Sequence, residues 1–364
     1  MCRPESRRAQ PLPKRIESWY AELMNGRAKL LIKCAITALL FWLIAQKVDL
    51  AGMSALLGKA QPFWLAAALG LVVVMTIFDA LAFCMMMRIF GHRVRLAPSL
   101  LYSLVSWFFS NLAPSTLGGD IFRTVQMQRL GAPLGTALRS VLAARLMSFA
   151  ALVPVILLGL PLALHLVDNA VERLTLMLIA GGGVTALLMA YAGFRLVPRL
   201  ARLAGSSLSG RILMLAEDFR RVNHSGTDTL SFWLLAAAQH IMRVGVLAAL
   251  AASLQLGIPF TTLFALAPAA LLVAMVPISL GSWGLREAAF VVFLGGAGIA
   301  PEAALSLSIV FGLLRVAMGG VGGLVWLAAD RSRYGFELDV GVDGLNNAEN
   351  GPEANDDGCV APSR

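Results

Sequence analysis

The chain has 364 residues, of which 58% are hydrophobic and only 14% charged, and its mean hydropathy is +0.75. Soluble proteins carry about 25% charged residues, and several apolar stretches here reach the ~20 residues that a helix needs to cross a bilayer, so a soluble fold is excluded. The net charge of +9 falls mostly on loops between apolar stretches, which indicates membrane topology and not nucleic-acid binding.

In chain order, a basic polar segment (1–28) comes first and is predicted to be cytoplasmic. Two later apolar regions, 98–131 and 260–300, are each interrupted by Pro and Gly, and an acidic tail (332–364) is predicted to be disordered. The uninterrupted apolar stretches predict six transmembrane helices, near 30–46, 63–87, 134–164, 174–194, 230–254 and 303–328. The predicted fold class is therefore an all-α polytopic membrane protein.

The loop charges predict which side of the membrane each loop occupies. The basic loops, including the linker 195–228, fall on one side only if the two interrupted regions each enter and leave the membrane by the same face. This favours two re-entrant hairpins, the first entering from the cytoplasm and the second from outside, with both termini cytoplasmic. The alternative is that each region is a broken crossing helix followed by a surface helix.

The two interrupted regions carry one motif, P-x-x-L-G-x-x-x-x-R, once from Pro114 to Arg123 and once from Pro277 to Arg286. The motif divides the membrane part into repeat 1 (29–170) and repeat 2 (171–331). Each half holds three crossings and one hairpin, so the second half lies inverted relative to the first, as in many secondary transporters.

The residue types of the motif predict an anion-binding site. Pro and Gly end one helix, and the helix that begins after Gly118 or Gly281 directs free N–H groups at the break, next to an arginine. Asp120 and Glu287 could cap these helices, pair with an arginine or carry a proton. The alternative is that the breaks are kinks and that Arg123 extends to the membrane surface. The candidate substrate-binding residues are Pro114, Gly118, Gly119, Asp120, Arg123, Pro277, Gly281, Trp283, Gly284, Arg286 and Glu287.

Four further charged residues, Asp79, Arg145, Arg243 and Arg315, fall inside apolar stretches. Charges there are costly and are usually functional, although a structural ion pair between Asp79 and one of these arginines is the alternative. The chain has no P-loop, GxGxxG or HExxH motif, and its four cysteines lack metal-ligand spacing. We therefore expect no metal, no cofactor and no enzymatic activity.

The stretches Asn111–Arg123 and Pro277–Glu287, together with Arg129-Leu-Gly131 and Arg145, resemble the lysylphosphatidylglycerol synthase transmembrane, or flippase-like, family. The resemblance covers about residues 30–330. The family that the chain resembles includes the flippase half of the bacterial multiple peptide resistance factor. Gly281-Ser-Trp-Gly284 departs from the Gly-Gly form that is common in the family.

The resemblance implies a flippase that moves an anionic or polar-headgroup lipid between leaflets of the bacterial inner membrane. Two-domain relatives carry a soluble synthase domain, which we do not expect here. A membrane-embedded lipid-linked transferase, with Asp120 or Glu287 as base, is an alternative. So is a non-catalytic partner of a lipid or cell-envelope biosynthetic enzyme.

Overall fold

The computed structural model describes residues 58, 60–112, 117–129, 132–204, 218, 220–222, 225–276 and 282–328. Within these residues the regular secondary structure is entirely helical, which confirms the predicted all-α class. The predicted cytoplasmic segment 1–28, the predicted span 30–46 and the acidic tail 332–364 lie outside the described residues, as do residues 205–217 of the linker 195–228.

Five described helices are long and apolar enough to cross a membrane, and they match the five predicted spans that fall within the described residues. The third helix is apolar from Ala170 to Ala192, which agrees with the predicted span 174–194. It continues as a helix to Ala204 because the segment after 194 is rich in Arg, Leu and Ala, which favour helix. The five helices are α4 (Pro62–Ile89), α7 (Leu134–Leu166), α8 (Ala170–Ala204), α10 (Thr227–Ser253) and α13 (Pro301–Ala328).

Each interrupted region forms two short helices that pack against each other. The first contains α5 (Leu96–Leu112) and α6 (Gly118–Arg129), and the second contains α11 (Phe260–Ala274) and α12 (Leu285–Gly295). With 12 and 11 residues, α6 and α12 are about 16–18 Å long, well short of the ~30 Å hydrocarbon core. The motif residues Pro114, Pro277 and Gly281 lie outside the described residues.

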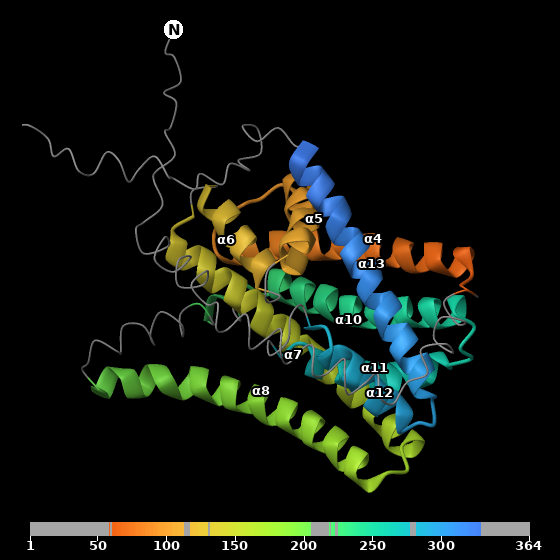
Figure 1. Ribbon diagram of the computed structural model, residues 1–364. Helices are drawn as coiled ribbons and strands as arrows, with labels where there is room; N and C mark the ends of the chain where they lie inside the picture. Colours follow the sequence, from red (N-terminus) through yellow and green to blue (C-terminus); the bar gives the residue numbers. More distant parts are fainter. Residues whose placement is uncertain are drawn as a thin grey trace, which may run out of the picture. The chain divides into compact units, whose positions relative to one another are not determined.

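The largest helix–helix contacts join one half of the sequence to the other. The most extensive contact between elements joins α4 of the first half to α10 of the second, and the next joins α13 to α5; Figure 1 shows α4 and α10 side by side. Small residues allow α13 to approach α5 closely, because a Cβ atom at Gly319 would meet Asn111 and one at Gly322 would meet the Leu104 carbonyl. Such small-residue contacts are typical of transmembrane helix pairs.

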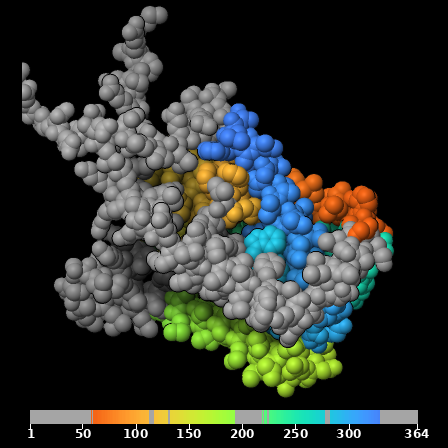
Figure 2. Space-filling model, viewed as in Figure 1, coloured from red at the N-terminus to blue at the C-terminus, as the bar shows by residue number. Residues whose placement is uncertain are grey.

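The main apolar core lies among α4, α10, α11, α12 and α13 and includes the wholly buried Phe290, Leu247 and Leu263. Large apolar side chains also cover the outer surfaces, among them Leu178 on α8 and Leu324 on α13. Both helices lie at the surface in the space-filling view (Figure 2, green and blue). Apolar outer faces of this kind are typical of helices that contact lipid chains.

Candidate functional site

A cavity of about 270 Å³ lies inside the helical bundle and is lined by residues from both halves of the chain. Its wall contains five arginines and two aspartates: Asp79, Asp120, Arg123, Arg145, Arg243, Arg286 and Arg315. So many ionisable groups at one place in a membrane bundle are costly unless they pair or serve a function.

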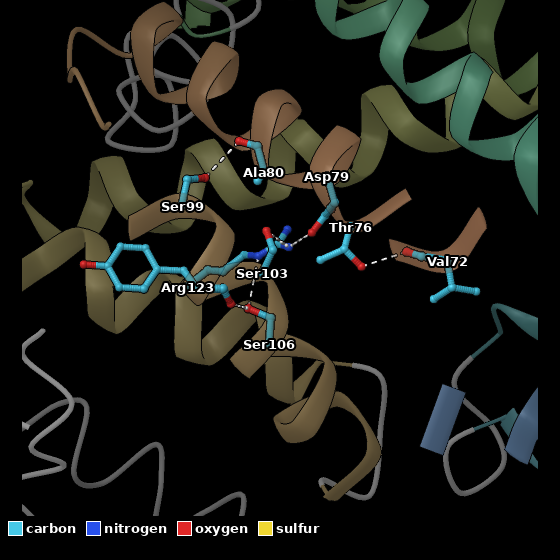
Figure 3. Close-up of polar contacts among 9 residues, drawn as sticks. Val72, Thr76, Asp79, Ala80, Ser99, Ser103, Ser106 and Arg123 are labelled. Atoms are coloured by element: carbon cyan, nitrogen blue, oxygen red, sulfur yellow. Dashed lines mark hydrogen bonds and ion pairs between the residues drawn. The ribbon is translucent and has the colours of Figure 1, made fainter. Parts of the chain in front are cut away.

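Arg123 of the first motif is paired with Asp79 of α4 (Figure 3). Its Nε also donates to the hydroxyl of Ser106 at 3.2 Å, and Nη2 donates to that of Ser103 at 3.4 Å. The Ser106 hydroxyl in turn donates to the Tyr102 carbonyl at 2.6 Å. Arg123 therefore points into the protein and does not extend to the membrane surface.

Gly119 explains how α6 reaches this position. A Cβ atom at residue 119 would meet the Ser110 hydroxyl and would lie 2.7 Å from the Ser106 carbonyl oxygen. Only glycine therefore lets α6 lie so close to α5, and this approach brings Arg123 to Ser106. In the first turn of α6, Asp120 forms an ion pair with Arg145 of α7.

Arg286 of the second motif is almost completely buried, and so is its neighbour Glu287. The two form an ion pair, and the Arg286 Nε lies 3.1 Å from both Glu287 Oε1 and the Ser308 hydroxyl of α13. Glu287 Oε2 accepts a hydrogen bond of 2.6 Å from the backbone N–H of Gly284, at the start of α12. Glu287 thus caps the helix and pairs with arginine, two of the three roles considered from the sequence.

The predicted helix start after Gly281 lies later in the structure, at Leu285. The delay follows from a turn in which Ser282 and Gly284 both have positive φ values, of 68° and 82°. This turn places Trp283 beside Arg286, whose guanidinium carbon lies 4.8 Å from the centre of the indole ring. Trp283 packs against the arginine and is not part of the cavity wall.

Arg243 of α10 is held by His240, one helical turn earlier. Its Nη1 donates to His240 Nδ1 at 2.8 Å, and His240 Nε2 lies 2.9 Å from the Ser148 carbonyl oxygen. Because a guanidinium can only donate, Nδ1 is the acceptor and Nε2 carries the ring proton. His240 is thus a neutral, fully satisfied interior group that orients Arg243 toward the cavity.

Arg315 of α13 lies opposite α5. Its guanidinium carbon is 5.7 Å from the ring centre of Trp107, and its backbone carbonyl accepts a 3.0 Å hydrogen bond from Asn111. The charge of Arg315 is repelled by the charges of Arg286 and Arg243 and attracted by that of Glu287. No carboxylate of the described residues forms an ion pair with Arg315 or Arg243.

A smaller cavity of about 150 Å³ adjoins the first and is lined by α4, α6, α7 and α10. The two cavities share part of their walls, including both members of the Asp79–Arg123 and Asp120–Arg145 pairs. These two ion pairs therefore lie between the cavities.

The family model described as "Lysylphosphatidylglycerol synthase TM region" matches residues 30–323. The chain belongs to this family. The match covers both halves of the bundle and every charged residue of the cavity wall, and it confirms the resemblance drawn from the paired motifs. A comparison with curated proteins finds no significant match.

The structure of this family member brings the four predicted buried charges, Asp79, Arg145, Arg243 and Arg315, into the cavity wall. Of the candidate binding residues, Gly119, Asp120, Arg123 and Arg286 also line the cavity. Gly118 begins α6, whereas Trp283, Gly284 and Glu287 lie behind the wall and support Arg286. Asp79 pairs with Arg123, and not with one of the other three arginines considered from the sequence.

Sequence reasoning missed the serines of α5. Ser103, Ser106 and Ser110 line the cavity, and Ser99 donates a 2.9 Å hydrogen bond to the Ala80 carbonyl (Figure 3). Their spacing of four, three and four residues places all four on one face of a helix. This polar stripe in an apolar helix was the signal that could have identified them.

Proposed function

We propose that this membrane protein moves a lipid with an anionic or polar headgroup between the leaflets of a bacterial inner membrane. The observation that carries the proposal is the cavity inside the apolar bundle, whose wall contains five arginines drawn from both halves. Arginine binds the phosphate or carboxylate of a headgroup through paired hydrogen bonds. Membership of a lipid-related membrane family supports the same substrate class.

The headgroup would occupy the cavity while the acyl chains stay in the surrounding lipid. Moving the headgroup requires the cavity to open to each face in turn, as in transporters built from inverted repeats. The two shared ion pairs, Asp79–Arg123 and Asp120–Arg145, are the groups a headgroup would meet between the cavities. When no headgroup is bound, the aspartates and serines that contact these two arginines remain as their hydrogen-bond and ion-pair partners.

A leaflet-translocation assay tests this proposal. The purified protein is reconstituted into liposomes with an acyl-labelled phosphatidylglycerol, and the label in the outer leaflet is reduced chemically. Ser148→Trp fills the wall that both cavities share, so translocation should fall at least about tenfold, to near the rate of protein-free liposomes.

The matched control is Leu158→Trp, on the same helix but 71% exposed at its lipid-facing surface. It should leave translocation within about twofold of wild type. Monodisperse elution of both variants shows that they fold. Wild-type protein that moves the lipid no faster than empty liposomes contradicts the proposal.

The topology is part of the proposal: both termini are cytoplasmic, and the breaks approach the site from opposite faces. It predicts that single cysteines at residues 117 and 282, in a chain without the native cysteines, react with a membrane-impermeant thiol reagent from opposite sides. Leu117 is 40% exposed, and Ser282 lines the cavity. Labelling of both positions from the same side would contradict the inverted arrangement.

The geometry gives less support to a transferase. Glu287 is fully buried and occupied by Arg286, Ser308 and the Gly284 N–H, so it is not free to accept a substrate proton. Asp120 is engaged by Arg145. A general base needs an accessible oxygen within hydrogen-bond reach of the proton it removes.

A further inference from the structure

We infer that Arg243 and Arg315 form the phosphate-binding subsite of the cavity, and that the cavity selects lipids whose headgroup is net negative and excludes aminoacylated, cationic headgroups. The inference rests on the proposed function and specifies its substrate class. It moves substrate recognition away from the two motif arginines to two arginines of the crossing helices α10 and α13.

The first step is the charge inventory of the site. Arg123, Arg145 and Arg286 are neutralised by Asp79, Asp120 and Glu287. Within the part of the chain that the structure describes, Arg243 and Arg315 form no ion pair, although they line the same cavity. The two motif segments outside the description, 113–116 and 277–281, contain no Asp or Glu that could neutralise them.

The second step is that these two arginines are already oriented for a ligand. His240 fixes Arg243 through one N–H, and among the described residues no hydrogen bond occupies its other donors, while Trp107 supports the guanidinium of Arg315 through its ring face. Both side chains are partly exposed, whereas Arg286 is only 2% exposed. Arg243 and Arg315 carry like charges in the wall of one cavity, so an anion bound near both would relieve their repulsion.

The third step concerns the headgroup that would not fit. A lysyl ester of phosphatidylglycerol adds two ammonium groups, which need carboxylate or carbonyl acceptors in a dry site. The acidic side chains of the cavity wall, Asp79 and Asp120, are both occupied by arginine, and so is Glu287 behind it. A cationic headgroup would have to break one of the partly exposed ion pairs of the wall while adding positive charge to a site with excess positive charge.

Lipid binding to the full-length protein in detergent tests this inference separately from transport. Thermal stabilisation and native mass spectrometry are measured with phosphatidylglycerol, phosphatidylethanolamine, lysylphosphatidylglycerol and soluble glycerol phosphate at equal concentrations. We expect phosphatidylglycerol to bind at least about tenfold more tightly than the lysyl ester, with phosphatidylethanolamine between them. Soluble glycerol phosphate should bind more weakly than the lipid, because it lacks the acyl chains.

Arg243→Gln and Arg315→Gln should each weaken phosphatidylglycerol binding about tenfold or more, because each removes a charged donor to the phosphate. Arg315→Lys keeps the charge and should retain part of the affinity if the glutamine variant fails to fold. Arg173→Gln, an exposed arginine near the start of α8, is the control and should bind like wild type.

Three results would overturn the inference: lysylphosphatidylglycerol binding as tightly as phosphatidylglycerol, wild-type affinity in both glutamine variants, or equally tight binding of soluble glycerol phosphate. Selective binding without any translocation in liposomes would instead uphold the subsite and contradict the proposed function.

Discussion

Glu287 holds Arg286 with one carboxylate oxygen and the first turn of α12 with the other. Oε1 pairs with the guanidinium, and Oε2 accepts the Gly284 N–H at 2.6 Å. The second motif therefore carries its own anion at the helix start. An external headgroup would have to displace that carboxylate to reach Arg286, which makes Arg286 mainly a structural residue of the cavity wall.

The first prediction concerns this pair. Glu287→Gln keeps the size of the side chain but leaves the Arg286 charge buried and uncompensated, so the free energy of unfolding should fall by about 3–5 kcal/mol. Denaturant-induced unfolding in detergent micelles measures the change. Asp168→Asn, at an exposed position after α7, should change stability by less than ~0.5 kcal/mol. A similarly small effect at Glu287 would contradict the assigned role.

The second prediction concerns the room that α13 leaves for Arg286. A Cβ atom at Gly312 would meet Arg286 Nη2 and would lie 2.7 Å from the Trp283 ring. Gly312→Ala should therefore destabilise the protein by about 1–3 kcal/mol. Gly320→Ala on the same helix meets open space and should be neutral or stabilise by up to ~1 kcal/mol, because alanine favours helix. Equal effects of the two substitutions in unfolding experiments would refute this packing.

The third prediction is an energetic coupling between Asp79 and Arg123. A double-mutant cycle with Asp79→Asn and Arg123→Gln should give a coupling energy of about 0.5–3 kcal/mol in unfolding free energy. The reference cycle uses Arg88 and Asp228, whose atoms are 3.5 Å apart and whose side chains are 53% and 23% exposed. Solvent screening should limit that coupling to below ~1 kcal/mol. Additive effects at Asp79 and Arg123 would mean that their ion pair does not contribute.

The fourth prediction concerns His240 as a positioning residue. His240→Leu removes the acceptor that orients Arg243, so phosphatidylglycerol affinity should fall about two- to tenfold, the value of one hydrogen bond. His240→Gln offers a new acceptor and should restore part of the affinity, which a purely packing role would not explain. His165→Leu, at an exposed position near the end of α7, should bind the lipid as wild type does. Native mass spectrometry reads out all three variants.

Much of the fold was predictable because membrane helices follow length and hydropathy. The predicted boundaries near 63–87 and 134–164 agree with α4 and α7 within a few residues, and Pro and Gly correctly marked both interrupted regions. The apolar span of α8 ends at Ala192, close to the predicted 194, but the helix runs on to Ala204 into a basic segment that was interpreted as a linker, because Arg, Leu and Ala support helix there.

The charged lining of the cavity was predictable in its members but not in its pairing. Asp79, Arg145, Arg243 and Arg315 were identified because charge in an apolar stretch is costly. Which carboxylate pairs with which arginine depends on how each helix is rotated about its axis. Arg123 pairs with an aspartate 44 positions earlier in the chain, whereas Arg286 pairs with its immediate neighbour. Sequence spacing alone could not separate these cases.

The contacts of α4 with α10 and of α13 with α5 have a consequence for the separated halves. Each half contributes one member to both of these contacts, and each supplies only part of the arginine lining. A fragment that ends in the linker between α8 and α10 would expose both of these surfaces and would hold an incomplete cavity. Two such fragments, expressed from separate genes, should recover function only by assembling with each other.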